Sequence, residues 1–268
     1  GSDFNDTIKD SEADNKFTGG FGEDTFQITA GFNTITDLHT GDIVRVDDGA
    51  TINALVEKEF IASNETVNFG TFKVLSSNNG THIDMSNALG GDYVLIGGSG
   101  DDLLVGGPED DILTGGDGLD TFVIHAGNDY ISDLSSGDAL KVSSGSTVTA
   151  FNIVNFVANN LTESFGSVTL MAEEGGAVIN LSLATAGEYV LVGHSGNDSL
   201  TGGPNNDFLT GDGSSRWSCA RTRSSASTAL APRAPVRRRA CASASRARSR
   251  APTTRARRPR SRRSGRAC

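Results

Sequence analysis

A nine-residue repeat constrains the fold of this chain more than any other feature. From Gly97 onward the sequence divides into five consecutive nonads: GGSGDDLLV, GGPEDDILT, GGDGLDTFV, IHAGNDYIS and DLSSGDALK. The sixth place is always aspartate, at Asp102, Asp111, Asp120, Asp129 and Asp138. The eighth place is always large and apolar, at Leu104, Leu113, Phe122, Ile131 and Leu140. A fixed period of this kind predicts a parallel β-solenoid to which each nonad contributes one short strand.

A longer period overlies the nonads, because the chain aligns with itself without gaps at a shift of 96 residues. For example, DTFQITAG at 24–31 matches DTFVIHAG at 120–127. The shift defines three nonad blocks, at residues 1–45, 97–141 and 193–213. The first block is degenerate, with asparagine at two sixth places (Asn15 and Asn33) and aspartate at Asp6, Asp24 and Asp42. The third block is truncated and has its sixth-place aspartates at Asp198 and Asp207.

Two spacers without nonads separate the blocks, at residues 46–96 and 142–192. In the first, TFKVLSS and THIDMSN flank Asn78-Asn79-Gly80, and in the second, SVTLMAE and AVINLSL flank Gly175-Gly176. Alternating runs on either side of such a turn predict β-hairpins. We expect each hairpin unit to pack on the end of a roll and to cover its open edge. The predicted fold is therefore all-β, with parallel β-rolls alternating with small hairpin-containing units.

The charge of the chain changes sign near Gly213. Up to that residue all 33 acidic residues stand against six basic ones, a net charge of −27, whereas the 17 arginines that follow have no acidic residue beside them. Residues 1–213, which we call the body, contain no cysteine and no apolar run as long as a membrane span requires. We expect residues 214–268 to be disordered. They are either an arm for nucleic acid or another anionic surface, or an out-of-frame translation of GC-rich DNA.

The residues of the nonads suit calcium. Glycines let the loop backbone curl and aim its carbonyls at one point. If two nonads make one turn, Asp102 faces Asp120, Asp111 faces Asp129, and Asp120 faces Asp138. Strands ~4.8 Å apart would place an ion midway between two stacked loops ~2.4 Å from the oxygens of each loop, within the calcium–oxygen range. Without the ion, two carboxylates ~5 Å apart repel by ~3 kcal/mol, so metal binding becomes folding free energy.

Three of the nonads, GGSGDDLLV, GGDGLDTFV and GGFGEDTFQ, follow the pattern GGxGxDxUx in full, where U is a large apolar residue. The chain resembles the RTX family, the calcium-binding β-roll repeats of bacterial proteins exported by type I secretion. The resemblance implies that the sixth-place aspartates and the loop carbonyls bind several Ca²⁺ ions. The glycines concerned are Gly19, Gly20, Gly22, Gly97, Gly98, Gly100, Gly106, Gly107, Gly115, Gly116, Gly118, Gly193, Gly196, Gly202 and Gly203. Some loops depart from the pattern, with Pro108, Pro204 and His194 at places of the motif.

The resemblance also implies export of an unfolded chain and folding in the calcium outside the cell. The chain has no initiator methionine, and we expect it to be part of a longer protein. Two functions are open at this point: a structural module of an adhesin or surface-layer protein, or the secretion and folding module of an extracellular enzyme or toxin. No nucleophile–base set, His-Glu-x-x-His or phosphate loop is present, so we expect no enzyme within this chain. Expected partners are calcium and a cell-surface or extracellular polymer, with no nucleic acid bound by the body.

Overall fold

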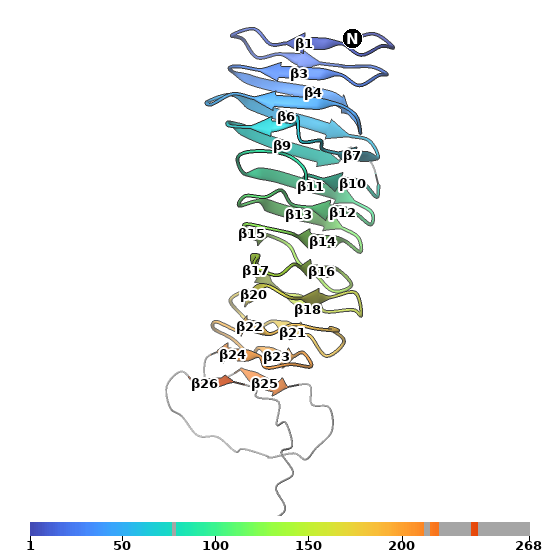
Figure 1. Ribbon diagram of the computed structural model, residues 1–268. Coiled ribbons are helices and arrows are strands. Elements are labelled where there is room, and N and C mark those ends of the chain that lie inside the picture. Colours follow the sequence, from blue (N-terminus) through green and yellow to red (C-terminus); the bar gives the residue numbers. More distant parts are fainter. Residues whose placement is uncertain (77–78, 212–214, 220–236, 241–268) are drawn as a thin grey trace, which may run out of the picture.

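The computed structural model describes residues 1–76, 79–211, 215–219 and 237–240. These residues form a parallel β-solenoid of about 11 turns and contain strands but no helix (Figure 1). The predicted all-β, parallel fold is therefore confirmed. Within the described part of the chain, no helix has the length and apolar character that crossing a membrane requires.

One face of the solenoid is a single sheet of twelve strands. In spatial order they are β2 (Lys16–Phe17), β4 (Phe32–Leu38), β6 (Thr51–Val56), β9 (Thr71–Ser76), β11 (Tyr93–Ser99), β13 (Ile112–Asp117), β15 (Asn128–Ile131), β17 (Thr147–Ile153), β20 (Ser167–Ala172), β22 (Tyr189–Val192), β24 (Phe208–Gly211) and β26 (Arg237–Ala240). We call it the long sheet. All its neighbours pair in parallel except β24 and β26, which are antiparallel.

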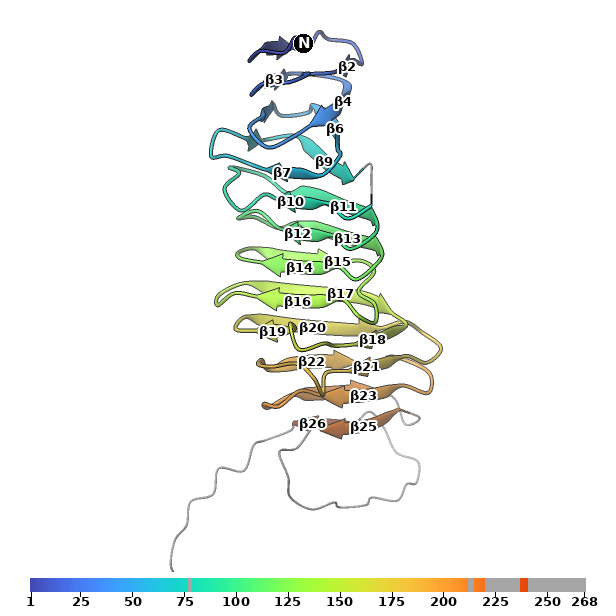
Figure 2. The ribbon, with the colours of Figure 1, turned by 90° about the vertical axis from the view of Figure 1, so that its right-hand side faces the viewer.

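The opposite face is divided into three shorter sheets (Figure 2). The first contains β1 (Thr7–Lys9), β3 (Thr25–Ile28), β5 (Ile43–Val46) and β8 (Val67–Asn68). The second contains β7 (Glu59–Ile61), β10 (His82–Asp84), β12 (Leu103–Val105), β14 (Thr121–Ile124), β16 (Ala139–Val142) and β19 (Glu163–Ser164). The third contains β18 (Asn155–Val157), β21 (Val178–Asn180), β23 (Ser199–Gly202) and β25 (Arg216–Cys219).

The eighth-place residues of block two form the core between the two faces. Leu104, Leu113, Phe122, Ile131 and Leu140 are each 0% exposed. Leu104 pairs in register with Phe122, and Phe122 with Leu140, so that one coil is 18 residues long and holds two nonads. Each such side chain contributes roughly 1.5–3 kcal/mol by burial, which explains why this place of the nonad is always apolar.

The predicted hairpins are wrong. β9 and β10, the two strands of the first spacer that were assigned to one hairpin, lie in different sheets, and each pairs in parallel with neighbouring coils. The same holds for β20 and β21 in the second spacer. Alternation around a glycine turn fits a hairpin and a solenoid corner equally well, and here the adjacent coils supply the partner strands. The spacers therefore continue the stack and do not cover its ends.

The 96-residue period corresponds to five coils of unequal length. Along the long sheet, Val94 pairs with Ile112, Tyr130 follows at the next coil, and Thr149, Thr169 and Val190 come after it. The steps are 18, 18, 19, 20 and 21 residues. The longer spacer coils are where one opposite-face sheet ends and the next begins, at β7 and β8 and again at β18 and β19. A copy of the unit thus extends the solenoid without interrupting it.

Two segments of the tail that was predicted to be disordered, β25 and β26, are strands in the structure. β25 pairs in parallel with β23, and β26 pairs with β24. The open end of a solenoid presents unpaired backbone groups, which can hydrogen-bond to an added strand whatever its side chains are. The rest of the predicted tail, residues 214, 220–236 and 241–268, lies outside the described residues.

Candidate metal centres along two edges

The sixth-place residues lie along the two edges where the chain passes between faces. Edge one comprises the loops that leave the long sheet, with Asp6, Asp24, Asp42, Asp102, Asp120, Asp138 and Asp198. Edge two comprises the loops that return to it, with Asn15, Asn33, Asp111, Asp129 and Asp207. Apart from Asp6 and Asn15, all of these side chains are buried, with at most 2% exposure. An isolated buried carboxylate is costly, so each of these needs compensating partners.

Each buried aspartate uses one carboxylate oxygen to bind the backbone of the preceding coil. Asp120 Oδ1 accepts the N–H of Asp102 at 2.9 Å, and Asp129 Oδ1 accepts that of Asp111 at 2.7 Å. Asp138 Oδ1 accepts the N–H of Asp120 at 3.0 Å. The predicted stacking of these residues is therefore present in the structure. The same bond begins each ladder after a spacer, from Thr81 to Asp102, Tyr93 to Asp111, Ala177 to Asp198 and Tyr189 to Asp207.

The second carboxylate oxygen lies over the first-place glycine of its own loop. A methyl group on Gly97 would lie 2.5 Å from Asp102 Oδ2, and one on Gly115 would overlap Asp120 Oδ2. The other first-place glycines, Gly19, Gly106, Gly193 and Gly202, face Oδ2 of Asp24, Asp111, Asp198 and Asp207 in the same way. The first glycine of the motif is therefore explained by space for the carboxylate and not by its backbone angle.

The second- and fourth-place glycines bring neighbouring loops into contact. Gly116 and Gly118 have φ of +99° and +147°, and a methyl group on either would overlap the carbonyl oxygen of Gly98 or Gly100 one coil earlier. Gly20, Gly22 and Gly196 also have positive φ, as do Gly98 and Gly100 themselves. His194 adopts φ of +50° in place of a glycine. Gly107 and Gly203 precede prolines and are not among the described positive-φ glycines, which fits the extended preference of a residue before proline.

Several of these carboxylates retain a buried oxygen with no hydrogen-bond partner. The atoms are Oδ2 of Asp24, Asp102, Asp129 and Asp207. A buried acceptor left unpaired costs about 1–3 kcal/mol, and more when it is charged. Oxygen-seeking cations such as calcium bind carboxylate and backbone carbonyl oxygens. The unpaired oxygens, buried beside the glycine loops, therefore fit a bound calcium ion.

The electrostatics of the edges also favour a cation. Burial is the largest cause that raises the pKa of Asp129 to about 8, and the charges of Asp111 and Asp110 add to it. Burial likewise raises the pKa of Asp111 to about 7 and that of Asp120 to about 6. Carboxylates with raised pKa values are held in a site that disfavours negative charge, and a nearby cation relieves that penalty.

Other sixth-place aspartates have both oxygens satisfied by the protein. Asp138 Oδ2 accepts the N–H of Ser135 at 2.7 Å, and Asp42 Oδ2 accepts that of His39 at 3.1 Å. These are the last aspartates of their blocks on edge one, so the ladder ends where the loop supplies its own donor. Similar donors reach the second oxygen of three more members: Gly107 N–H for Asp111, Ser2 N–H for Asp6 and the Ser215 hydroxyl for Asp198.

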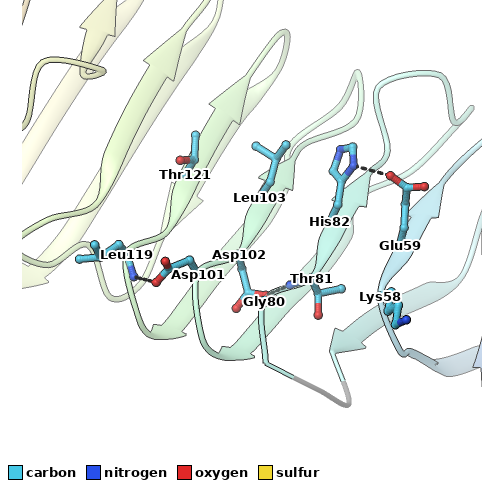
Figure 3. Close-up of a pocket in the computed structure, with 10 residues that line it drawn as sticks. All are labelled: Lys58, Glu59, Gly80, Thr81, His82, Asp101, Asp102, Leu103, Leu119 and Thr121. Atoms are coloured by element: carbon cyan, nitrogen blue, oxygen red, sulfur yellow. Dashed lines mark hydrogen bonds and ion pairs between the residues drawn. The ribbon is translucent and has the colours of Figure 1, made fainter.

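A pocket of about 350 Å³ opens on edge one beside Asp102 (Figure 3). Thr81 occupies the sixth-place position of the spacer coil there and donates its N–H to Asp102. Across the pocket His82 Nδ1 and Glu59 Oε1 are 2.9 Å apart. Asp102 Oδ2 is unpaired. Because Thr81 belongs to the spacer, this first candidate site of block two lies between a nonad loop and a spacer loop.

Two further sets of acidic residues support the loops, and sequence reasoning missed them. Asp101 and Asp110, in the fifth place, accept the N–H of the fifth-place residue one coil later, at 2.9 and 2.7 Å. Asp133 accepts the N–H of both Gly115 and Gly116, at 3.0 and 2.7 Å. The recurrence of Asp or Asn in the fifth place was the available signal. Asp133 lies outside the sixth-place ladder but still holds a nonad loop.

In the part of the chain that the structure describes, no three His, Cys, Asp or Glu side chains cluster so that they could hold a metal ion. A cation at these edges would therefore combine one or two carboxylates with backbone carbonyls. The family model for the RTX calcium-binding nonapeptide repeat matches the chain in four copies, over residues 1–35, 96–131 and 190–215. Searches of curated proteins and of solved structures found no match. The chain therefore carries RTX calcium-binding nonapeptide repeats in these three segments.

Proposed function

We propose that this chain is a structural segment of a bacterial adhesin or surface-layer protein, which folds on calcium outside the cell and performs no catalysis. RTX repeats bind calcium, and proteins that carry them are typically secreted by bacteria. The calcium-binding role rests on one observation above all. Buried carboxylates stand in register along each edge, and the second oxygens of Asp24, Asp102, Asp129 and Asp207 lack a partner.

Calcium would supply the positive charge that these buried carboxylates lack. In block two, Asp102 and Asp120 would hold it on edge one, together with carbonyls of the glycine loops. The protein itself contributes the alignment: each Oδ1 is fixed by a backbone N–H, so that Oδ2 has little freedom to turn toward solvent. Because the unfolded chain has no such alignment, calcium binds the folded state preferentially and stabilises it.

The structural part of the proposal is supported by the 96-residue unit. It comprises five coils, after which the equivalent residue of the next unit, 96 positions later, takes the same place in the long sheet. Units of this kind can be duplicated in tandem without a linker, which is the property expected of an extended surface protein. The proposal assigns no catalysis because the buried aspartates are engaged with backbone N–H groups, a structural use of carboxylates.

The location outside the cell is supported by the affinity expected of such loops. Extracellular calcium modules bind with Kd of about 10⁻⁴–10⁻³ M, far above the calcium of a bacterial cytoplasm. The chain would stay unfolded inside and order only after export. This coupling would keep the solenoid, whose open ends present unpaired strand backbone, from forming before secretion.

A calcium titration of the full chain tests the proposal. Far-UV circular dichroism should show β-structure appearing at millimolar calcium and disappearing with a chelator, and magnesium should substitute poorly. In parallel, small-angle scattering should show the radius of gyration falling to less than about half of the roughly 57 Å expected for 268 unfolded residues. A chain whose spectrum and size ignore calcium would refute the proposed function.

A further inference from the structure

In their sixth-place residues, the first and second blocks differ on one edge only. Asn15 and Asn33, the two sixth-place asparagines of the first block, both lie on edge two, where block two has Asp111 and Asp129. On edge one the same block keeps aspartate throughout. The loop ITAGFN, which ends at Asn33, is the 96-residue counterpart of IHAGND, which ends at Asp129. These two loops therefore form a matched pair within one molecule.

Asn33 and Asp129 make the same first hydrogen bond. Asn33 Oδ1 accepts the N–H of Asn15 at 3.1 Å, just as Asp129 Oδ1 accepts the N–H of Asp111 at 2.7 Å. Because a backbone N–H can only donate, its partner in Asn33 must be the amide oxygen. The amide nitrogen is therefore on the other side, in the position that Oδ2 takes in an aspartate.

The second atom is where the two residues differ. Asn33 Nδ2 donates to the carbonyl of Ala30, in the same loop, at 2.7 Å. Asn15 Nδ2 donates to the carbonyl of Ala13, the fourth-place residue of its own loop. Asp129 has an oxygen at this position, and that oxygen is buried without a partner. An aspartate here needs a positive group between itself and the loop, whereas an asparagine carries its own donor.

We propose that Asn15 and Asn33 are built-in substitutes for bound calcium. The amide nitrogen of each joins the sixth-place side chain to a loop carbonyl, so that edge two of the first block closes without a metal ion. An asparagine in the sixth place then marks a loop that takes no calcium. This inference rests on the proposed function, because it assumes that the aspartate loops bind calcium. It predicts a first block that depends on calcium along edge one alone.

A weak calcium site is the competing interpretation of these loops, and the hydrogen bonds argue against it. The only oxygen of the Asn33 side chain already accepts a backbone N–H, and also lies 3.1 Å from Asn15 Nδ2. The carbonyl of Ala30 is likewise engaged by Nδ2. A cation would have to displace the amide hydrogens from the carbonyl that it would otherwise bind.

Exchange of the two residues tests the inference in the full chain. Asn33→Asp should bind one more calcium ion per chain than the parent, and Asp129→Asn at least one fewer, measured by equilibrium dialysis with radioactive calcium. Asp129→Asn should keep the β-structure of the parent in saturating calcium, because the amide makes both bonds. Asp117→Asn, an exposed aspartate in a nonad loop, is the control and should leave the count unchanged.

The outcomes separate this inference from the proposed function. If the parent chain binds no calcium, the proposed function fails and the inference with it. If the parent binds calcium but neither exchange changes the count, the substitution idea is wrong and the proposed function stands. Asp129→Asn that does not fold in calcium would also refute the idea, since the asparagine would then be unable to replace the aspartate and its ion.

Discussion

Asp120 is the residue whose replacement should reveal most about the calcium ladder. It accepts the N–H of Asp102 and donates its own N–H to Asp138, so it lies at the centre of edge one in block two. Asp120→Ala removes the acceptor for the buried Asp102 N–H, at a cost of about 1–3 kcal/mol. It also weakens the calcium sites on both sides. With calcium at ten times Kd, each site contributes ~1.4 kcal/mol, or ~3 kcal/mol for the two. The expected loss is roughly 4–6 kcal/mol.

Asp120→Asn separates the two contributions. The amide oxygen can still accept the Asp102 N–H, so this variant should lose only the calcium part, roughly 3 kcal/mol. In a chelator the same change should be close to neutral or stabilising, since it removes a buried carboxylate. Both variants are compared with the parent by urea unfolding, followed by circular dichroism with and without calcium.

Asp117→Ala is the matched control, because Asp117 is an exposed aspartate in the same loop. Its effect should stay within about 0.5 kcal/mol. Asp133 would be a poor control, since it holds the N–H groups of Gly115 and Gly116. Equal effects of Asp117→Ala and Asp120→Ala would show that overall charge, and not the ladder, sets calcium dependence. Equal effects of Asp120→Ala and Asp120→Asn would refute the role given to the backbone acceptor.

Three further predictions concern pH and the glycine places of the loops. Without calcium, the folded-state pKa values of Asp129 (about 8) and Asp111 (about 7) exceed the unfolded value near 3.9, so the folded state binds more protons. Metal-free stability should therefore rise as the pH falls from about 8 toward 4, and the chelated chain should show more β-structure at pH ~5 than at pH ~8; a flat profile would contradict the burial of these groups. His194→Gly should raise stability in urea by about 0.5–1 kcal/mol, because it removes a left-handed non-glycine residue, and a decrease would mean that the imidazole makes a contact worth more than the strain. Gly115→Ala should cost about 1–3 kcal/mol and raise the calcium midpoint, because its methyl group would overlap Asp120 Oδ2, and an unaffected midpoint would show that the carboxylate can move aside.

The sequence by itself determined the parts of this protein that repeat. A nine-residue period with one apolar place specifies both the strand and the residue that points inward, because an extended strand alternates its faces. The pairing of Leu104 with Phe122, and the stacking of Asp102 on Asp120, follow from two nonads per coil and are present in the structure. The same reasoning failed in the spacers, where strand signals such as those of β9 and β10 do not state which strand each will pair with.

Only the tertiary structure decided what happens to each sixth-place side chain. Asp102 and Asp138 occupy the same place of the motif, yet Asp102 Oδ2 is unpaired and Asp138 Oδ2 accepts the N–H of Ser135. Asn33, which looks like a degenerate aspartate in the sequence, uses both its amide oxygen and its amide nitrogen in hydrogen bonds. The physical reason is that these donors come from the shape of each loop and from residues one coil away. The motif determines where the carboxylate acceptors lie along the sequence. The stacked backbone determines which of these acceptors receive an N–H and which are left for a cation.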